Sequence, residues 1–190
     1  MGKSSFGNEI WLNRELMEYS LKIFTGFIEP HLFAGFSGGV KAIRPGMAGL
    51  KTILGNHNPA NISHSKAPFG ITRGNPGCEE IFEIAQKAGR NFLVNVALNN
   101  QKEITGVFAG DLLQAHTQGC EFVRETAMSA LDSLFDIVIT TNSSFPLDLN
   151  LYQSVKGMAA AAPITKKGGS IILVQSVLNA YLIMGCTADC

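Results

Sequence analysis

Two residues that could transfer protons or act as nucleophiles, His31 and Lys41, lie early in the chain and are separated by a glycine-rich segment. An imidazole moves protons near neutral pH, and a lysine amine supplies a positive charge or a nucleophile. Gly38 and Gly39 allow positive φ angles, and backbone N–H groups in such a loop can cradle a phosphate or a carboxylate. A tight structural turn followed by a solvated lysine would show the same residues, so both interpretations stay open.

The glycine-rich loop does not follow the common nucleotide-binding motifs. A P-loop requires GxxxxGK followed by Ser or Thr, whereas Ala42 follows Lys41. The GxGxxG fingerprint of dinucleotide-binding folds is also missing from the sequence. If the loop binds an anion, it does so in another way.

Two further places have residues suited to a metal or a substrate. His57 lies in a segment rich in Asn and Pro, where an imidazole can face a metal or a substrate, and His64 is a weaker candidate for a second ligand. Gln153 and Lys156 are spaced i, i+3 on a predicted helix and so share a face. An amide and an ammonium together can hold a carboxylate, although an ordinary polar helix face would carry the same pair.

The elements that must position these residues alternate between helices and strands. Residues 92–98 and 103–109 are expected to form an antiparallel hairpin. Asp111 and Gln114 form a capping box for the following helix, in which His116 falls on the apolar face and is expected to be packed in the core. The remaining predictions are helices over 14–22, 50–54, 78–88 and 147–162 and strands over 23–28, 135–140 and 170–175. The three strands are apolar and are expected to be buried.

This order predicts an α/β fold. Residues 1–130 are expected to form a Rossmann-like α/β domain with a mixed sheet that carries the glycine-rich loop, with its N-terminal part missing. Residues 131–190 are expected to begin a second α/β domain, because strand, helix and strand at this spacing make a βαβ unit with a right-handed crossover. One such unit is too small for a complete domain, so we expect the second domain to be truncated.

The composition excludes several classes of protein. Of the 190 residues, 46% are hydrophobic and 16% charged, which argues against disorder. Fifteen basic and fifteen acidic residues cancel, so bulk charge predicts neither a nucleic-acid partner nor a membrane surface. Four irregularly spaced cysteines without CxxC predict free thiols in a cytoplasmic protein rather than a zinc site.

Over residues 13–176 the sequence resembles the nickel-pincer-dependent lactate racemase family. The resemblance lies in the order and spacing of a histidine, a glycine-rich lysine loop and a second histidine, followed by a helix with Gln and Lys. The matching residues are His31, Gly35, Ser37, Gly38, Gly39, Lys41, Pro45, Gly46 and His57, the segments 107–111 and 150–156, and Gly168 with Gly169.

The resemblance implies a role for each of these side chains. Lys41, with Gly38 and Gly39 beside it, matches the lysine loop that binds a nickel-pincer nucleotide covalently, and His57 matches the protein ligand to nickel. His31 matches a catalytic acid/base. In the implied reaction a histidine removes the 2-hydroxyl proton of a small 2-hydroxy acid, hydride passes to the cofactor, and its return to either face of the 2-keto acid gives either enantiomer.

The resemblance also implies what this chain lacks. Gln153 and Lys156 match residues that contact the substrate, but the family has a second catalytic histidine and a carboxylate-binding arginine in a region before this chain begins. We therefore expect a fragment that is inactive by itself and, because truncation exposes strand edges, tends to form homo-oligomers. A non-enzymatic module that binds an anionic small ligand and an assembly domain that needs another chain are the alternatives.

Overall fold

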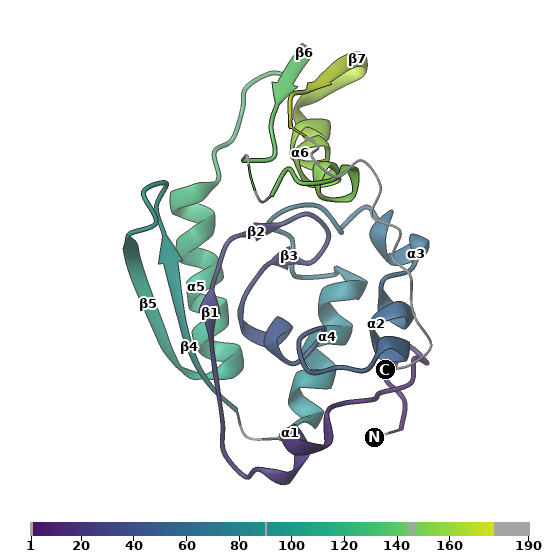
Figure 1. The fold of residues 1–190 in the computed structure, drawn as a ribbon, viewed down its shortest axis with the longest axis vertical. Coiled ribbons are helices and arrows are strands. Elements are labelled where there is room, and N and C mark those ends of the chain that lie inside the picture. The colour runs from purple at the N-terminus through teal and green to yellow at the C-terminus, as the bar shows by residue number, and fades with distance from the viewer. Residues whose placement is uncertain (1, 90, 144, 146, 177–190) are drawn as a thin grey trace. The chain divides into compact units, whose positions relative to one another are not determined.

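The computed structural model describes residues 2–89, 91–143, 145 and 147–176. The chain divides into two compact units, Met1–Ser129 and Ala130–Cys190, and the elements of each are labelled in Figure 1. The prediction that Pro146 begins a new element and the cysteines at 186 and 190 lie outside the described residues. The predicted α/β class with a mixed sheet is confirmed.

The first unit is built on a mixed sheet in the order β1–β4–β5. Strand β1 (Lys22–Phe27) pairs in parallel with β4 (Asn91–Leu98). Strand β4 pairs antiparallel with β5 (Ile104–Asp111), so the predicted hairpin is confirmed. The preceding helix α1 (Arg14–Glu18) is shorter than predicted, because Tyr19 already has an extended backbone and only Leu16 of the helix is buried.

Helix α5 (Leu112–Ala127) covers one face of this sheet, as Figure 1 shows. Asp111 caps it, since its Oδ1 accepts hydrogen bonds from the N–H groups of Leu113 and Gln114 at 3.0 and 3.1 Å. The helix approaches the sheet closely at Gly119, where an added Cβ would lie 2.2 Å from Ile28. His116 is 2% exposed, so its predicted place in the core is confirmed.

The segment predicted as a long loop contains short elements. Strands β2 (Pro30–His31) and β3 (Gly35–Phe36) pair antiparallel, and the 3-10 turn η1 (Gly39–Ala42) follows. Helix α2 (Leu50–Asn56) is longer than predicted, and α3 (Pro59–Ile62) lies where only loop was expected, because Asn58 caps it. Helix α4 (Pro76–Lys87) confirms the predicted helix and is capped by Asn75.

The second unit has the predicted strand–helix–strand order. Strands β6 (Phe135–Thr140) and β7 (Thr165–Leu173) pair in parallel. Between them lie helix α6 (Leu151–Ala161), capped by Asn150, and the 3-10 turn η2 (Ala162–Ile164). Strand β7 begins earlier than predicted, because it runs through Gly168 and Gly169 with a shift in register.

The prediction that three strands are buried was wrong, since Ile23 and Phe27 on β1 and Ile172 on β7 are exposed. Strand β6 was expected to be buried on both faces, yet Ile137 is 62% and Ile139 is 68% exposed, and Val138 is the buried residue of the strand. Apolar strands of this kind are normally covered on both faces. Among the described residues of this unit, helix α6 packs against β6, and the apolar side chains of β6 that α6 does not contact are exposed.

Candidate functional site

His31 and His57 are brought together by Phe33. The ring of Phe33 lies edge-on to His31 at a centroid distance of 4.8 Å and edge-on to His57 at 5.0 Å. His31 is placed by the β2–β3 pair, where it is opposite Gly35. His57 directly follows helix α2. Phe33 itself packs against the hydrophobic core of the first unit, which fixes the position of the ring that both histidines contact.

The orientation of the His57 ring is defined by the backbone of α2. Its Nδ1 lies 3.0 Å from the carbonyl oxygen of Ile53, which also accepts a hydrogen bond from the His57 N–H. A carbonyl oxygen can only accept, so Nδ1 carries the proton and Nε2 has a free lone pair. Burial lowers the pKa of His57, the Ile53 contact opposes this, and Arg44 and Lys41 lower the pKa further. The ring is therefore neutral at pH 7, which is the form that binds a metal.

Lys41 lies within electrostatic range of His57 and of His116, since its charge helps to lower the pKa of both rings. For His116 burial is the main cause, opposed by the contact between its Nε2 and the Ser37 carbonyl oxygen at 3.0 Å. His31 and His57 thus share contact with Phe33, and the charge of Lys41 acts on His57. His64 does not take part: it is exposed, and its Nδ1 accepts a hydrogen bond from the Lys66 N–H at 3.2 Å.

Gly38 and Gly39 are required by the packing of this loop. Both have positive φ angles, and a Cβ on Gly39 would lie 2.2 Å from the His116 ring. A Cβ on Gly38 would lie 2.6 Å from Oδ1 of Asn95. That same oxygen accepts a hydrogen bond from the Gly39 N–H at 2.7 Å. Packing therefore explains both glycines, and their contact with a cofactor stays a prediction.

The second unit carries the predicted substrate residues on α6. Gln153 is half-buried, and its Oε1 is a buried atom with no hydrogen-bond partner in the described part of the chain. Lys156 is exposed. A buried amide oxygen can accept a hydrogen bond from a further donor. This fits a binding role for Gln153, whereas the contact of either residue with a substrate stays a prediction.

The described residues contain no group of three or more His, Cys, Asp or Glu side chains placed to hold a metal. Cys78 and Cys120 are buried free thiols, and burial raises the pKa of each to about 12. They are thus protonated and unsuited to bind a metal. A metal in this region would therefore find at most two such side chains together among the described residues.

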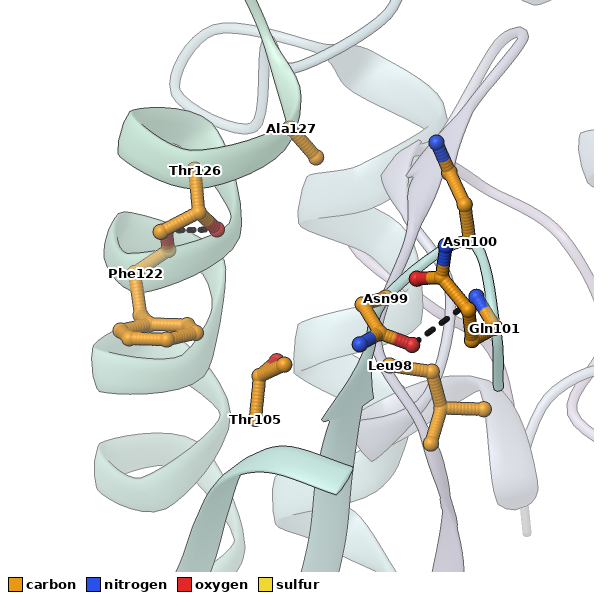
Figure 2. Close-up of a pocket in the computed structure, with 8 residues that line it drawn as sticks. All are labelled: Leu98, Asn99, Asn100, Gln101, Thr105, Phe122, Thr126 and Ala127. Carbon is orange, nitrogen blue, oxygen red and sulfur yellow. Dashed lines mark hydrogen bonds between the residues drawn. The ribbon is translucent and has the colours of Figure 1, made fainter. Parts of the chain in front are cut away.

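A cavity of about 500 Å³ lies between the β4–β5 turn and the end of α5 (Figure 2). Asn99, at its edge, accepts a hydrogen bond from the Gln101 N–H at 3.0 Å. The lining residues are Leu98, Asn99, Asn100, Gln101, Thr105, Phe122, Thr126 and Ala127. None of them is a histidine, lysine or carboxylate, so this cavity lacks the groups for acid–base chemistry.

Three residues that shape the site had no motif to reveal them. Phe33 is one apolar residue among several in its segment. Asn95 is the one polar residue between Phe92 and Leu98. A single amide in an apolar strand indicates that its side chain makes a hydrogen bond inside the protein. Glu80 falls on the apolar face of α4 and is fully buried, which is a similar signal.

Comparison with known proteins assigns both units to racemase domains. Residues 1–70 match the lactate racemase N-terminal domain family, and residues 131–180 match the lactate racemase C-terminal domain family. The lactate racemase of Lactiplantibacillus plantarum is 44% identical over 182 residues, and that of Thermoanaerobacterium thermosaccharolyticum is 43% identical over 181 residues. Each alignment covers 95% of this chain, which spans 42% of the length of these relatives.

Solved structures agree. The lactate racemase apoprotein from Thermoanaerobacterium thermosaccharolyticum matches with a TM-score of 0.89 and 42% identity, over 93% of this chain and 42% of that protein. A protein from Thermotoga maritima matches with a TM-score of 0.56 and 22% identity, over 71% of this chain and 35% of that protein, which shows a shared fold alone. The chain belongs to the lactate racemase family.

Among the described helices, none has the length and apolar character needed to cross a membrane.

Proposed function

We propose that this chain carries the cofactor-binding and proton-transfer residues of a 2-hydroxyacid racemase that uses a nickel-pincer nucleotide. The observation that carries the proposal is that His31 and His57 both contact the ring of Phe33, with the charge of Lys41 in range of His57. The lactate racemases that resemble this chain support a small 2-hydroxy acid as the substrate class.

His57 and Lys41 are the residues that would hold the cofactor. The Nε2 lone pair of His57 suits nickel, because imidazole is a good ligand for this metal and its Nδ1–H is already bonded to a carbonyl oxygen. The Lys41 amine would form the covalent attachment. Bound in this way, the cofactor supplies a hydride acceptor and donor for the 2-carbon of the substrate.

His31 would exchange the proton of the substrate's 2-hydroxyl group. Its Nδ1 lies 3.3 Å from the Ala34 nitrogen and 3.5 Å from the Phe33 nitrogen. These backbone N–H groups orient the ring, because they donate to the Nδ1 lone pair. In the neutral ring Nε2 then carries the proton, so in this orientation we assign it the donor half of the exchange, giving a proton to the substrate oxygen.

Gln153 and Lys156 would bind the substrate through its polar groups. The buried Oε1 of Gln153, which lacks a partner in the described residues, can accept a hydrogen bond from a hydroxyl group. The Lys156 ammonium can pair with the substrate carboxylate. By itself the chain is expected to show no racemisation, since a second acid/base is needed for the opposite face of the substrate. Racemisation by the purified chain with cofactor supplied would contradict this.

The test is the intact mass and nickel content of the chain produced in a host that makes the pincer cofactor. We expect an adduct that maps to Lys41 and about one nickel per chain. Lys41→Arg should lose both, whereas His57→Ala should lose nickel and keep the adduct. Lys51→Arg, at an exposed lysine, is the matched control. Binding of phosphate or a carboxylate without any adduct would instead support an anion-binding module.

A further inference from the structure

A buried ion pair joins Arg44, which follows the lysine loop, to Glu80 on helix α4. Arg44 is 1% exposed, and its Nη1 lies 3.5 Å from Oε2 of Glu80, which is 0% exposed. Burial lowers the pKa of Arg44 to about 10, an effect that Glu80 opposes, so Arg44 keeps its charge at pH 7. A buried pair of this kind adds little net stability over apolar residues of similar size. Its presence therefore calls for another explanation.

Arg44 holds the last turn of α2. Its Nη2 donates to the carbonyl oxygen of Thr52 at 2.5 Å, and its Nε donates to the same oxygen at 3.2 Å. Nη2 also lies 3.5 Å from the carbonyl oxygen of Ile53. This is the oxygen that faces the Nδ1 of His57 at 3.0 Å. A cation at the C-terminal end of a helix interacts favourably with its exposed carbonyl groups.

Glu80 is also hydrogen-bonded to the last turn of α2. Its Oε2 accepts a hydrogen bond from Nδ2 of Asn56 at 2.8 Å, and Asn56 directly precedes His57. Its Oε1 accepts from Ser4 Oγ at 2.6 Å and from Asn8 Nδ2 at 2.8 Å. Two of these donors lie near the N-terminus and one on α2, so a single carboxylate joins three segments of the first unit.

We propose that Arg44 and Glu80 are positioning residues that fix the end of α2, so that His57 keeps Nδ1 on the Ile53 carbonyl oxygen and presents Nε2. Neither residue touches the reacting atoms. The inference deepens the proposed function and rests on it for the meaning of Nε2 as a metal ligand. The link from Arg44 to His57 runs through the Ile53 carbonyl oxygen, and the link from Glu80 runs through Asn56.

The experiment reads the His57 tautomer in the full chain without nickel, by long-range ¹H–¹⁵N correlation of the imidazole rings at pH 8. The signal of His57 is identified by its loss in His57→Gln. We expect the wild-type ring to be mainly the Nδ1–H form. Asn56→Ala should lower the ratio of the two tautomers by about fivefold, the order expected for losing one net hydrogen bond. Ser4→Ala removes a donor to the same carboxylate that does not reach α2, and should leave the ratio unchanged.

The double substitution Arg44→Met with Glu80→Met tests the pair itself. Replacing both partners by apolar residues avoids leaving a single buried charge. It also removes the partners of Asn56 and of the Thr52 carbonyl oxygen, so survival of the fold is checked in the same spectra. The His116 signal reports that survival, since its Nε2 faces the Ser37 carbonyl oxygen in the core. Intact His116 with a lowered His57 ratio supports the proposal. Intact His116 with an unchanged His57 ratio, in both Asn56→Ala and the double variant, overturns it.

These outcomes are separate from those of the proposed function. The tautomer is measured without cofactor, whereas the adduct and nickel content are measured on the loaded chain. A changed tautomer ratio in a chain that never takes up nickel would leave the positioning role intact and remove the racemase proposal. A wild-type ratio in folded variants that also load nickel normally would remove the positioning role and leave the racemase proposal.

Discussion

The two faces of the β1–β4–β5 sheet are opposite in character. The inner face is covered by α5 and η1 and contains a buried amide, Asn95, whose Oδ1 binds the Gly39 N–H at 2.7 Å. The outer face is apolar and exposed. Its exposed side chains, between 39% and 62% accessible, are Ile23, Phe27, Phe92, Leu98, Ile104 and Val107. Buried polar groups thus shape the site, whereas exposed apolar groups suit contact with further protein.

Among substitutions on the inner face, Gly39→Ala is expected to lower the free energy of unfolding the most. The added Cβ would lie 2.2 Å from the buried His116 ring, at a φ of +51°. Overpacking and the left-handed backbone together should lower the free energy of unfolding by about 3–5 kcal/mol. Urea unfolding followed by the fluorescence of Trp11, the single tryptophan, measures this in the first unit.

Gly7→Ala is the matched control for that substitution. Gly7 also has a positive φ, +85°, but nothing lies within 4 Å of its added Cβ. Its cost should be limited to the backbone term of about 1–2 kcal/mol. Equal losses for the two variants would show that contact with His116 does not matter at Gly39.

Alanine substitutions on neighbouring strands compare the two faces directly. Leu93 on β4 is 0% exposed, so Leu93→Ala should lower the free energy of unfolding by about 2–5 kcal/mol. Val107 on β5 is 62% exposed, and Val107→Ala should change it by about 0.5 kcal/mol or less. Both are measured by urea unfolding. A large loss for Val107→Ala would mean that the outer face is covered in solution.

The inner face should also make stability depend on pH. Burial lowers the pKa of His116 in the folded state, so below pH 6.5 the unfolded chain binds a proton that the folded chain does not. Stability should therefore fall as the pH drops below about 6.5, by at most about 1.4 kcal/mol per pH unit for this group. Unfolding free energies between pH 5 and 8 measure the slope.

His116→Gln should reduce that slope, because the amide can still donate to the Ser37 carbonyl oxygen but does not titrate. The part that remains is expected from His57, whose pKa burial also lowers. His64→Gln replaces an exposed imidazole and is the matched control. If both variants keep the wild-type slope, other groups cause the pH dependence.

Sequence patterns correctly predicted the elements in which apolar and polar residues alternate with a clear period. The β4–β5 hairpin alternates clearly and is followed by Asp111 as a cap, so both were found. Helix α1 was predicted too long, because a short amphipathic stretch cannot reveal that Tyr19 becomes extended. Burial of β6 was predicted from its apolar residues alone, although burial depends on what covers the strand.

The candidate site residues could be named from the sequence, and their roles stay predictions, whereas the residues that support them were not predicted. The spacing of His31, Lys41 and His57 carried the resemblance, and in the structure both histidines contact Phe33. Phe33 and Glu80 were missed because their partners are set by packing between segments distant in the sequence. A buried charge or amide within an apolar pattern was the available signal, and it marks both Glu80 and Asn95.

The smallest effect on stability, and the sharpest test of the outer face, is expected from lysine substitutions there. Ile104 and Val107 are each 62% exposed on β5, and an exposed apolar sheet face promotes association. We expect the wild-type chain to form homo-oligomers, and Ile104→Lys with Val107→Lys to shift it toward the monomer while unfolding free energy changes by about 0.5 kcal/mol or less. Sedimentation velocity at several concentrations measures the mass. A monomeric wild-type chain, or a variant that associates as strongly, would show that this face does not mediate self-association.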